Sequence, residues 1–594
     1  MKNVCKTKYS FKTLVHFVSL IYIFSKKVMS RIGLTILQHH LILYIHIMKK
    51  VKKINLIDIL IQVLLVLAVV FFVLMPFLSV FKESFIIDGH IDLSYYSNIL
   101  SNKNLLFNSL KLATLTSVFS LIFSTVLAIY AYVSKEKIKK IINLILLITL
   151  VSPPFVTSLS YITLFGRRGF ITHNLLSLSI NPYNMWGVVF MQTLSYISLN
   201  CLVLLGYLST MKNDVINSAR SLGANTNSII MDILVPQLKN GIYTVFLLSF
   251  FKSISDFATP SIIGGRFNVL ALESYFEVIA NGNLSKASAM NVLLLISILF
   301  VYVLVNFLNK GKSSTSSSNN LSELNIQRKG FVYILFKIIG ILILLLLLSL
   351  YIAIILSAFT TMKKGSLVFS LDNFLNAKEY MNDAMLRSIV YSLISALFGT
   401  FIGMLIGYYL IIKNSKFMKI IDLISNMPYI IPGTFFGLGY LLYFKAPPIM
   451  ITGTSIIVVL NVLFKQLPFS SRVGNTAMKS IDTDVINSLR DLGANTFYEI
   501  KDGIIPNIKP SLRISLINSF TTTMTTVGSI IFLVYPGKKL LTLVMFDVIN
   551  SGKYGQGSVI SLMIMIICII FNILINWMFG NKIFKERSNY VLGN

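Results

Sequence analysis

Two charged residues, Lys252 and Asp256, interrupt an otherwise apolar stretch of the chain. Charged side chains in such stretches usually face a protein interior or an aqueous path, because hydrocarbon solvates them poorly. Their spacing predicts that both lie on one helix face, where they can pair. Thr522 and Thr526 stand 270 residues later at the same depth of a second apolar stretch. Two interpretations remain open. Either all four positions face an aqueous pathway, or Lys252 and Asp256 form a structural ion pair.

The residue types that catalysis requires form no recognisable pattern elsewhere. A loop that cradles the phosphates of ATP is rich in glycine and ends in lysine. The nearest candidate, GKYGQG at 552–557, is followed by Ser558 where lysine is needed. No paired catalytic carboxylates and no nucleophile motif occur in the sequence. We therefore expect a chain that is not an enzyme and that relies on another subunit for any ATP hydrolysis.

Metal-ligating residues are equally scattered. The three cysteines, Cys5, Cys201 and Cys568, are far apart and have neither metal-ligand nor disulfide spacing. Four of the six histidines lie within the first 47 residues without ligand spacing. We expect no metal site and no cofactor bound by this chain.

The composition indicates the kind of protein in which Lys252 and Asp256 lie. The 594 residues are 55% hydrophobic and 12% charged, and the mean hydropathy is +0.77. Soluble chains carry about 25% charged residues, and this chain also has apolar runs of bilayer-spanning length. The sequence predicts an all-α polytopic membrane protein.

The net charge of +30 does not indicate nucleic-acid binding. Ten lysines and one arginine, with no acidic residue, precede Asp58, and further basic residues fall in short loops such as 134–140. Basic loops between apolar spans mark the cytoplasmic side of a membrane. We expect a bilayer partner, no nucleic-acid partner, and both termini in the cytoplasm.

Residues 1–47 differ from the rest, because Lys26, Lys27 and Arg31 break their apolar stretches. Met48 begins a basic segment before a long apolar span, which is a usual way to fix orientation. Either residues 1–47 are a real basic extension, or translation begins at Met48. We favour the second alternative and expect an intact chain that begins at Met48.

Twelve apolar spans are predicted in two sets of six, separated by a Ser- and Asn-rich linker at 311–330. The predicted domains are 48–310 and 331–594. The spans are expected near 58–80, 106–133, 141–165, 184–209, 241–263, 288–309, 331–357, 385–412, 419–443, 451–467, 511–534 and 555–579.

The two sets are copies of one unit. Residues 214–226 read DVINSARSLGANT and residues 484–496 read DVINSLRDLGANT, with eleven of thirteen positions identical. The same offset aligns Pro236 with Pro506 and Gly282 with Gly552. Such a register indicates a tandem duplication of a six-span unit in parallel orientation.

The duplicated loops are polar, so packing against lipid does not explain why they diverged so little. Two equivalent loops suit a symmetric partner with two equivalent sockets. Asp214 and Asp484 are expected to cap short helices, which Gly223 and Gly493 then end in a left-handed conformation. The alternative is an ordinary capped helix at the membrane surface.

These loops resemble the EAA loop of permeases of bacterial ATP-binding-cassette importers. The triplets begin at Asn217 and Asn487, so the leading Glu of the family pattern is missing, while the spacing, glycine and proline are kept twice. The resemblance implies that the loops couple the permease to its ATPase. The implied coupling residues are Asp214, Asn217, Ser218, Ala219, Gly223, Ala224 and Pro236, with Asp484, Asn487, Ser488, Leu489, Gly493, Ala494 and Pro506 in the second copy.

The segments 108–113, 255–278 and 532–555 resemble the ferric-iron-type branch of these permeases. The resemblance implies the two-domain import-permease fold in the bacterial inner membrane. It also implies a partner ATPase, expected to be a homodimer, and an extracytoplasmic substrate-binding protein. We expect ferric iron as substrate, with phosphonate, thiamine and polyamine as alternatives. A secondary transporter is a further alternative, but it leaves the duplicated loops unexplained.

Overall fold

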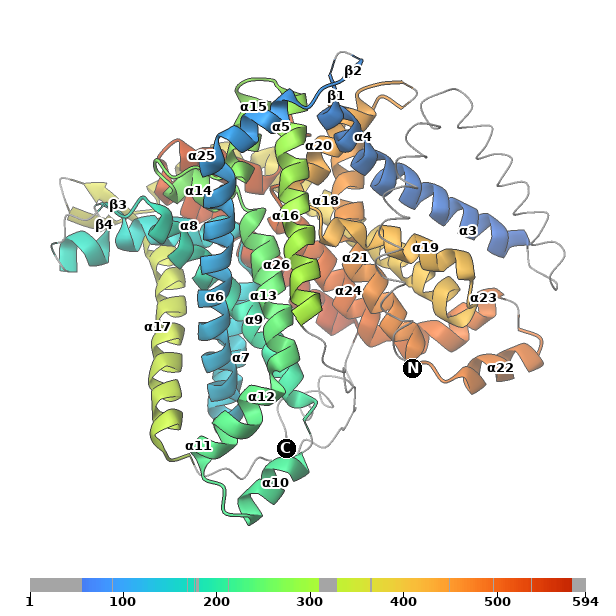
Figure 1. The fold of residues 1–594 in the computed structure, drawn as a ribbon, viewed down its shortest axis with the longest axis horizontal. Helices are drawn as coiled ribbons and strands as arrows, with labels where there is room; N and C mark the ends of the chain where they lie inside the picture. The colour runs from blue at the N-terminus through green and yellow to red at the C-terminus, as the bar shows by residue number, and fades with distance from the viewer. Residues whose placement is uncertain are drawn as a thin grey trace. The chain divides into compact units, whose positions relative to one another are not determined.

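The computed structural model describes residues 56–579 except 88, 168, 176, 178–180, 212, 309–327, 364–365, 448, 495 and 536. The basic extension, the proposed start at Met48 and most of the linker therefore lie outside the described residues. The chain divides into two compact units, 1–74 and 75–594. In the first unit the structure describes α3 (Leu56–Val69) and the π-helical turn η1 (Val70–Leu74). Everything that follows concerns the second unit (Figure 1).

The second unit is helical, and its described strands form two short hairpins, β1 (Ile86–Ile87) with β2 (His90–Ile91) and β3 (Thr360–Lys363) with β4 (Ser366–Phe369). Its first half contains α4 (Met75–Phe85), α5 (Ser94–Ser101), α6 (Lys103–Val133), α7 (Glu136–Val151), α8 (Pro154–Phe165), η2 (Phe170–Leu175), α9 (Met185–Ser209), α10 (Asn213–Ser221), α11 (Thr226–Ser228), η3 (Ile229–Leu234), α12 (Val235–Gln237), α13 (Lys239–Ile254), α14 (Ala258–Ile263), α15 (Leu270–Ile279) and α16 (Leu284–Leu308).

The second half repeats this order with small changes. It contains α17 (Phe331–Phe359), α18 (Asp372–Gly407), η4 (Tyr408–Ile412), α19 (Lys416–Ser425), η5 (Met427–Tyr429), α20 (Gly433–Phe444), α21 (Ser455–Lys479), α22 (Thr483–Asp491), α23 (Thr496–Tyr498), η6 (Glu499–Ile504), α24 (Ile505–Thr525), α25 (Leu541–Asn550) and α26 (Tyr554–Phe579).

The prediction of an all-α membrane protein is confirmed. Eight described helices are long and apolar enough to cross a membrane, and the number rises to 11 if each of three bent helix pairs counts as one span. The predicted span without a match is 511–534. Its helix α24 carries Lys509, Arg513 and the internal Pro510, which lower its hydropathy.

Two predicted straight spans are broken instead. The span predicted at 141–165 bends by 105° between α7 and α8, and the span at 419–443 bends by 113° between η5 and α20. Pro153 and Pro432 stand at these breaks with extended backbone and directly precede α8 and α20. Proline has no backbone N–H and disfavours helix in the preceding residue, so each break is set locally.

The helix contacts of the two halves are equivalent. In each half the second span packs on the fourth, as α6 on α9 and α18 on α21, and the fifth span packs beside both. The first helix of each half crosses to the other half, because α4 packs on α20 and α17 packs on α8. Figure 1 shows α17 running beside α6 and α7 of the first half.

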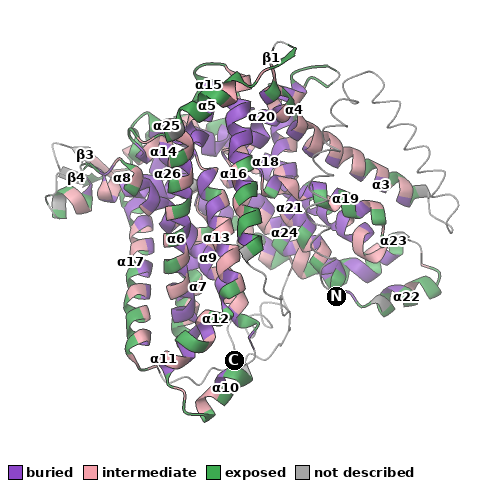
Figure 2. Cartoon of the chain, viewed as in Figure 1, coloured by how far each residue is buried: buried purple, intermediate pink, exposed green. Residues whose placement is uncertain are grey.

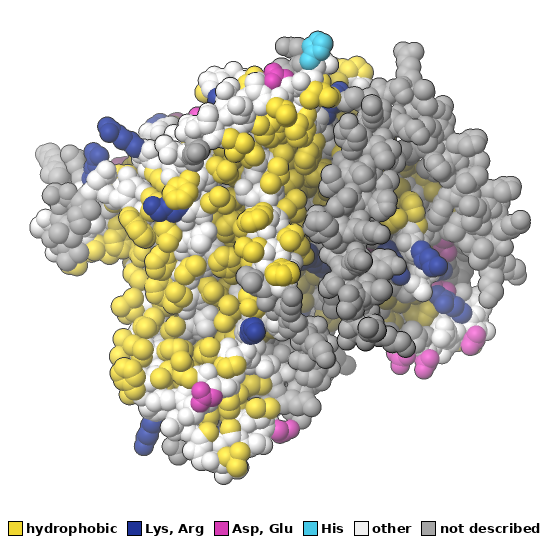
Figure 3. Space-filling view, viewed as in Figure 1, with side chains coloured by type: hydrophobic (Ala, Val, Ile, Leu, Met, Phe, Trp, Pro, Cys, Tyr) yellow, Lys and Arg dark blue, Asp and Glu magenta, His cyan; other side chains and the backbone are white. Residues whose placement is uncertain are grey.

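Buried polar contacts join the halves and complete each core. The Thr434 hydroxyl donates a hydrogen bond of 2.9 Å to Asn291 across the interface, and both residues are buried. In α16 residues 287–295 are buried and most of the later residues are exposed, whereas exposed and buried residues alternate along α17 (Figure 2). Hydrophobic side chains cover the outer face over α6, α16 and α17, where charged side chains are sparse (Figure 3). This face suits contact with lipid.

Candidate functional site

The duplicated loops fold as predicted into two short helices of nine residues, α10 and α22. Both helices end at a glycine with positive φ, +86° at Gly223 and +81° at Gly493. In each loop the glycine N–H donates to an arginine carbonyl, and the next N–H, from Ala224 or Ala494, reaches back five residues; all four hydrogen bonds measure 2.9 Å. This is the Schellman arrangement, which glycine adopts without strain.

The predicted cap at Asp484 is wrong by two positions. Asp484 lies inside the first turn of α22, and the capping side chain is Asp482, which accepts a hydrogen bond of 3.0 Å from the Asp484 N–H. Asp214 likewise lies in the first turn of α10, which begins at Asn213. A carboxylate there still interacts favourably with the helix dipole.

Each short helix buries one apolar residue and exposes others. Ile216 and Ile486 are 1% and 2% exposed, whereas Leu222 and Leu492, beside the glycines, are 88% and 84% exposed. A single exposed leucine is ordinary on a protein surface, but here an exposed leucine recurs at the equivalent position of both copies. Figure 1 shows α10 and α22 projecting from the helical bundle. Both are therefore rigid knobs with an apolar tip.

Each knob packs against the helical segment that leads into the fifth span of its half. α10 packs on η3, which continues through α12 to α13, and α22 packs on η6, which continues into α24. The Leu489 side chain lies against Gly503. A Cβ added at Gly503 would lie only 2.5 Å from Cδ1 of Leu489, so this position has no space for a side chain. The equivalent positions hold Ala219 and Ile233. One copy pairs the large Leu489 with a glycine, and the other pairs the small Ala219 with an isoleucine. This exchange explains the difference between Ala219 and Leu489, one of the two differences between the duplicated loops.

The second knob has an additional ion pair. Arg490 donates two hydrogen bonds to Glu499, of 2.8 and 3.1 Å, and the Tyr408 hydroxyl donates a third of 3.2 Å. Burial by itself raises the pKa of Glu499, but the hydrogen bond from Arg490 and the charge of Lys413 outweigh it and lower the pKa below its ordinary value. Glu499 therefore stays ionised and holds α22 against η6.

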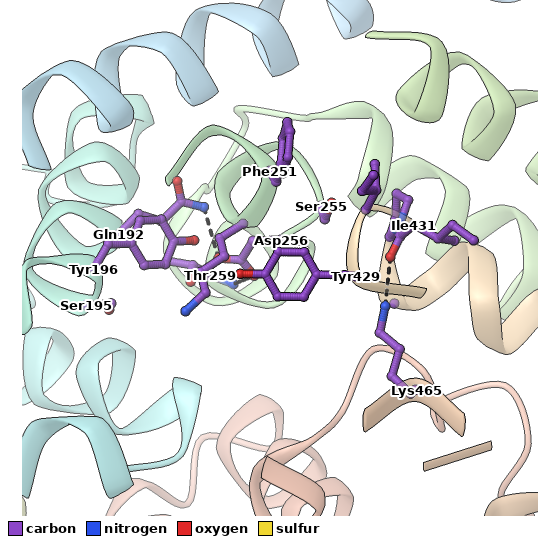
Figure 4. A pocket seen from close by; sticks show the side chains of 14 residues that line it. Gln192, Ser195, Tyr196, Phe251, Ser255, Asp256, Thr259, Tyr429, Ile431 and Lys465 are labelled. Carbon is purple, nitrogen blue, oxygen red and sulfur yellow. Dashed lines mark hydrogen bonds between the residues drawn. The ribbon is translucent and has the colours of Figure 1, made fainter. Parts of the chain in front are cut away.

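A cavity of about 370 Å³ lies between the two halves (Figure 4). The first half contributes residues of α9, α13 and the loop before α14, and the second half contributes the break at 429–433 and Lys465 of α21. Its lining residues are Gln192, Ser195, Tyr196, Phe251, Lys252, Ser255, Asp256, Thr259, Tyr429, Ile430, Ile431, Pro432, Gly433 and Lys465.

The structure places Lys252 and Asp256 together in this cavity but does not pair them. Helix α13 ends at Ile254, so Asp256 lies beyond it and the expected helix spacing does not apply. The Asp256 carboxylate instead accepts the N–H groups of Ala258 and Thr259 at 2.9 and 3.1 Å, and the Gln192 amide at 2.9 Å. The ion pair is therefore not formed, because the Asp256 carboxylate binds the first two N–H groups of α14 instead.

Thr522 and Thr526 are not among the described residues that line the cavity. The Thr522 hydroxyl donates to the Asn518 carbonyl at 2.6 Å, and the Thr526 carbonyl accepts a hydrogen bond from Thr542. α24 ends at Thr525, so the two threonines also do not share a helix.

Lys465 is the charged residue of the cavity that the sequence analysis missed. Its ammonium group donates two hydrogen bonds of 2.7 Å, to the carbonyls of Pro428 and Ile431, and lies 5.7 Å from the Phe436 ring centroid. Figure 4 shows Lys465 reaching the break before α20. Its sequence signal was a lysine inside the apolar span predicted at 451–467.

The part of the chain that the structure describes has neither a metal-ion cluster nor, at 552–557, a phosphate-binding loop. No group of three His, Cys, Asp or Glu side chains is arranged to hold a metal ion there. The glycine-rich stretch at 552–557 is a helix connection in which Gly552, with φ of +76°, ends α25 and the later glycines begin α26. It has no phosphate-loop geometry.

A duplicated helical core, with two equivalent knobs and a polar cavity between the halves, defines a membrane permease of two fused domains. The chain belongs to the family described as the binding-protein-dependent transport system inner membrane component, whose model matches residues 120–314 and again 399–581. This confirms the predicted resemblance, and it makes the chain a multi-pass inner-membrane transport component. Members of this family work with an ATPase and a substrate-binding protein.

Two ferric transport permeases are similar to most of the chain, and a phosphonate transport permease is similar to about a third of it. The ferric transport system permease protein FbpB of Actinobacillus pleuropneumoniae is 25% identical over 551 residues, which are 87% of this chain and 77% of that protein. The putative ferric transport system permease protein FbpB 1 of Haemophilus influenzae is 25% identical over 79% of this chain and 77% of its own length. The putative 2-aminoethylphosphonate transport system permease protein PhnV of Salmonella typhimurium is 26% identical over 34% of this chain and 77% of its own length.

Proposed function

We propose that this chain forms the translocation pathway of an ATP-driven importer and couples the pathway to a separate ATPase. The observation that carries the proposal is the pair of knobs, α10 and α22, each with an exposed leucine at its tip and a packed connection to a span behind it. In the first half that span is α13, which carries Lys252 into the cavity. Movement of the knob therefore reaches the cavity through η3, α12 and α13, which follow one another with a bend of 60° at Leu238.

The two knobs fit an ATPase that presents two equivalent sockets, which a homodimer provides. In this assignment ATP is bound and hydrolysed by the partner, and the permease binds no cofactor itself. The loops then face the cytoplasm, as do both termini. The opposite side receives cargo from a substrate-binding protein.

Ferric iron is the proposed cargo, because the relatives that align with most of the chain are ferric transport permeases by name. A phosphonate is the second candidate, supported by the likeness to PhnV over about a third of the chain. Thiamine and polyamine are supported only by the resemblance of segments 108–113, 255–278 and 532–555 to the ferric-iron-type branch. The duplicated knobs disfavour a secondary transporter, which needs no ATPase.

The decisive experiment is reconstitution of the permease in proteoliposomes with its ATPase and binding protein. ATP-dependent accumulation of ⁵⁵Fe, which stops when the ATPase is omitted, is the expected result. A deletion strain that takes up ferric iron normally but loses uptake of a phosphonate or thiamine would reassign the cargo. Uptake that persists without the ATPase would reject the importer itself.

A further inference from the structure

The side chains that line the cavity between the halves carry more positive than negative charges. Two lysines, Lys252 and Lys465, line it, together with one carboxylate, Asp256. The side chain of Lys252 is exposed where it lines the cavity, although its backbone belongs to a helix packed within the bundle. Charged groups at such positions face an aqueous path and act on whatever passes through it.

The single carboxylate has little capacity left for a cation. Asp256 already accepts three hydrogen bonds, two from backbone N–H groups and one from Gln192. The Gln192 carbonyl is in turn engaged by Ser253 at 2.6 Å and by Thr116 at 3.2 Å. Because its oxygens already accept these bonds, the Asp256 carboxylate is poorly placed to bind cargo.

Lys252 differs from Asp256 in that its hydrogen-bonding capacity is unused among the described residues. No described carboxylate oxygen lies within 4.0 Å of its ammonium group, whose nearest recorded partner is the face of the Tyr196 ring, at 5.8 Å. A ring face leaves the three N–H donors of the ammonium group available. Lys465 adds a second positive charge from the other half and uses two of its donors on backbone carbonyls. The local field is therefore positive and has a free donor group.

We propose that the cargo passes this cavity as an anion, and that Lys252 binds its oxygen atoms. Resting on the proposed importer function, this assigns the cargo class as either an oxyanion or a ferric ion enclosed in an anionic oxygen chelate. A bare ferric ion would meet two ammonium groups, and repulsion grows with the product of the charges. An anion meets a free ammonium donor and a favourable field.

The first test measures the field without cargo or ATPase. Ser255 lines the cavity and is replaced by cysteine in a Cys5→Ala chain, while the buried Cys201 and Cys568 are kept. The variant is placed in nanodiscs and treated with two thiol reagents, the anionic sulfonatoethyl and the cationic trimethylammonioethyl methanethiosulfonate. Each rate is divided by the rate of the same reagent with a free thiol. The thiol of the Ser255→Cys variant should then react at least tenfold faster with the anionic reagent. Lys252→Met should remove most of this preference and Lys252→Arg should restore it. Lys337→Met, at an exposed lysine of α17, should leave it unchanged.

A preference for the cationic reagent, or equal rates, would overturn the proposal. So would an introduced thiol that neither reagent reaches. The second test uses the complete system and ⁵⁵Fe(III) supplied as ¹⁴C-citrate, with ³²P-labelled phosphate and a ¹⁴C-labelled phosphonate in parallel. Joint entry of ⁵⁵Fe and ¹⁴C identifies a chelate, and entry of a phosphorus compound alone identifies an oxyanion.

In either case Lys252→Met should reduce uptake at least tenfold. Entry of ⁵⁵Fe without its chelator, at a rate that Lys252→Met leaves unchanged or raises, contradicts the anionic cargo while leaving the importer function intact. Failure of the importer function instead appears as loss of the ATP dependence of uptake, which the reagent test does not involve.

Discussion

Arg220 and Arg490 occupy equivalent positions in the two knobs, yet within the described residues only Arg490 is paired, by two hydrogen bonds to Glu499. The residue equivalent to Glu499 in the first half is Ile229, which is buried. No carboxylate in the described part of the chain lies within 4.0 Å of the Arg220 guanidinium. The two knobs therefore have the same shape but are held with different strength.

Replacing Glu499 by Gln should loosen the second knob specifically. The change removes the charge that holds Arg490 and Tyr408, at a cost on the order of 1–3 kcal/mol. Hydrogen exchange of the α22 amides should accelerate, while exchange of α10 stays unchanged. Equal acceleration in both knobs would contradict a local effect. Ile229→Val, at the equivalent buried position of the first half, is the matched control.

The contribution of Glu499 should also depend on pH. Its folded-state pKa lies below the ordinary value, so its stabilisation is fully present above the unfolded-state pKa and is lost as pH falls through the folded value. The difference in thermal stability between wild type and Glu499→Gln should be constant from neutral pH to about 5 and shrink toward pH 3. A difference that grows on acidification would refute the assignment.

The double replacement Gly223→Val and Gly493→Val should uncouple the permease from its ATPase. A β-branched residue at these positive φ angles costs about 1–3 kcal/mol, although an added Cβ meets no neighbouring atom within 4 Å. We expect folded, membrane-inserted protein that does not bind or stimulate the ATPase. Gly206→Val is the control, because Gly206 has equal space and no positive φ. Normal transport by the double variant would exclude the knobs as coupling elements.

The contact of α18 with α21 should tolerate no side chain at Gly407. A Cβ there would lie 2.6 Å from the backbone of Gly474, whereas a Cβ at Gly399, two turns earlier, would have its nearest neighbour at 3.9 Å. Gly407→Ala should lower the free energy of unfolding by about 1–3 kcal/mol, and Gly399→Ala should change it little. Thermal unfolding in detergent compares the two. Equal effects would show that the helices separate readily.

Cysteines at Thr522 and Thr526 test how far the pathway extends beyond the cavity. We keep the hypothesis that both positions face the pathway, and the structure adds an expected order. Ser255→Cys, in the cavity, should react fastest with small water-soluble thiol reagents, and Thr522→Cys should react more slowly and mainly in one nucleotide state. If the reagents reach neither threonine position in any nucleotide state, both residues are structural.

Much of the fold was predictable because its signals are local or repeated. Apolar runs of bilayer length located the membrane segments, and a constant offset of 270 residues revealed the duplication. The helix ends at Gly223 and Gly493 followed from residue type alone, since glycine adopts a left-handed turn most easily. The cap of α22 was predicted two positions too late, because Asp482 and Asp484 are the same residue type and lie within one helical turn.

The tertiary structure decided what these segments do together. Lys252 and Lys465 are 213 positions apart in sequence, and nothing in either apolar run indicates that they line one cavity. The pairing of Arg490 with Glu499, and the loss of the expected pair between Lys252 and Asp256, depend on where α22 meets η6 and where α13 ends. Helix periodicity fixes which face a residue occupies, but only packing fixes which residue of another helix it meets.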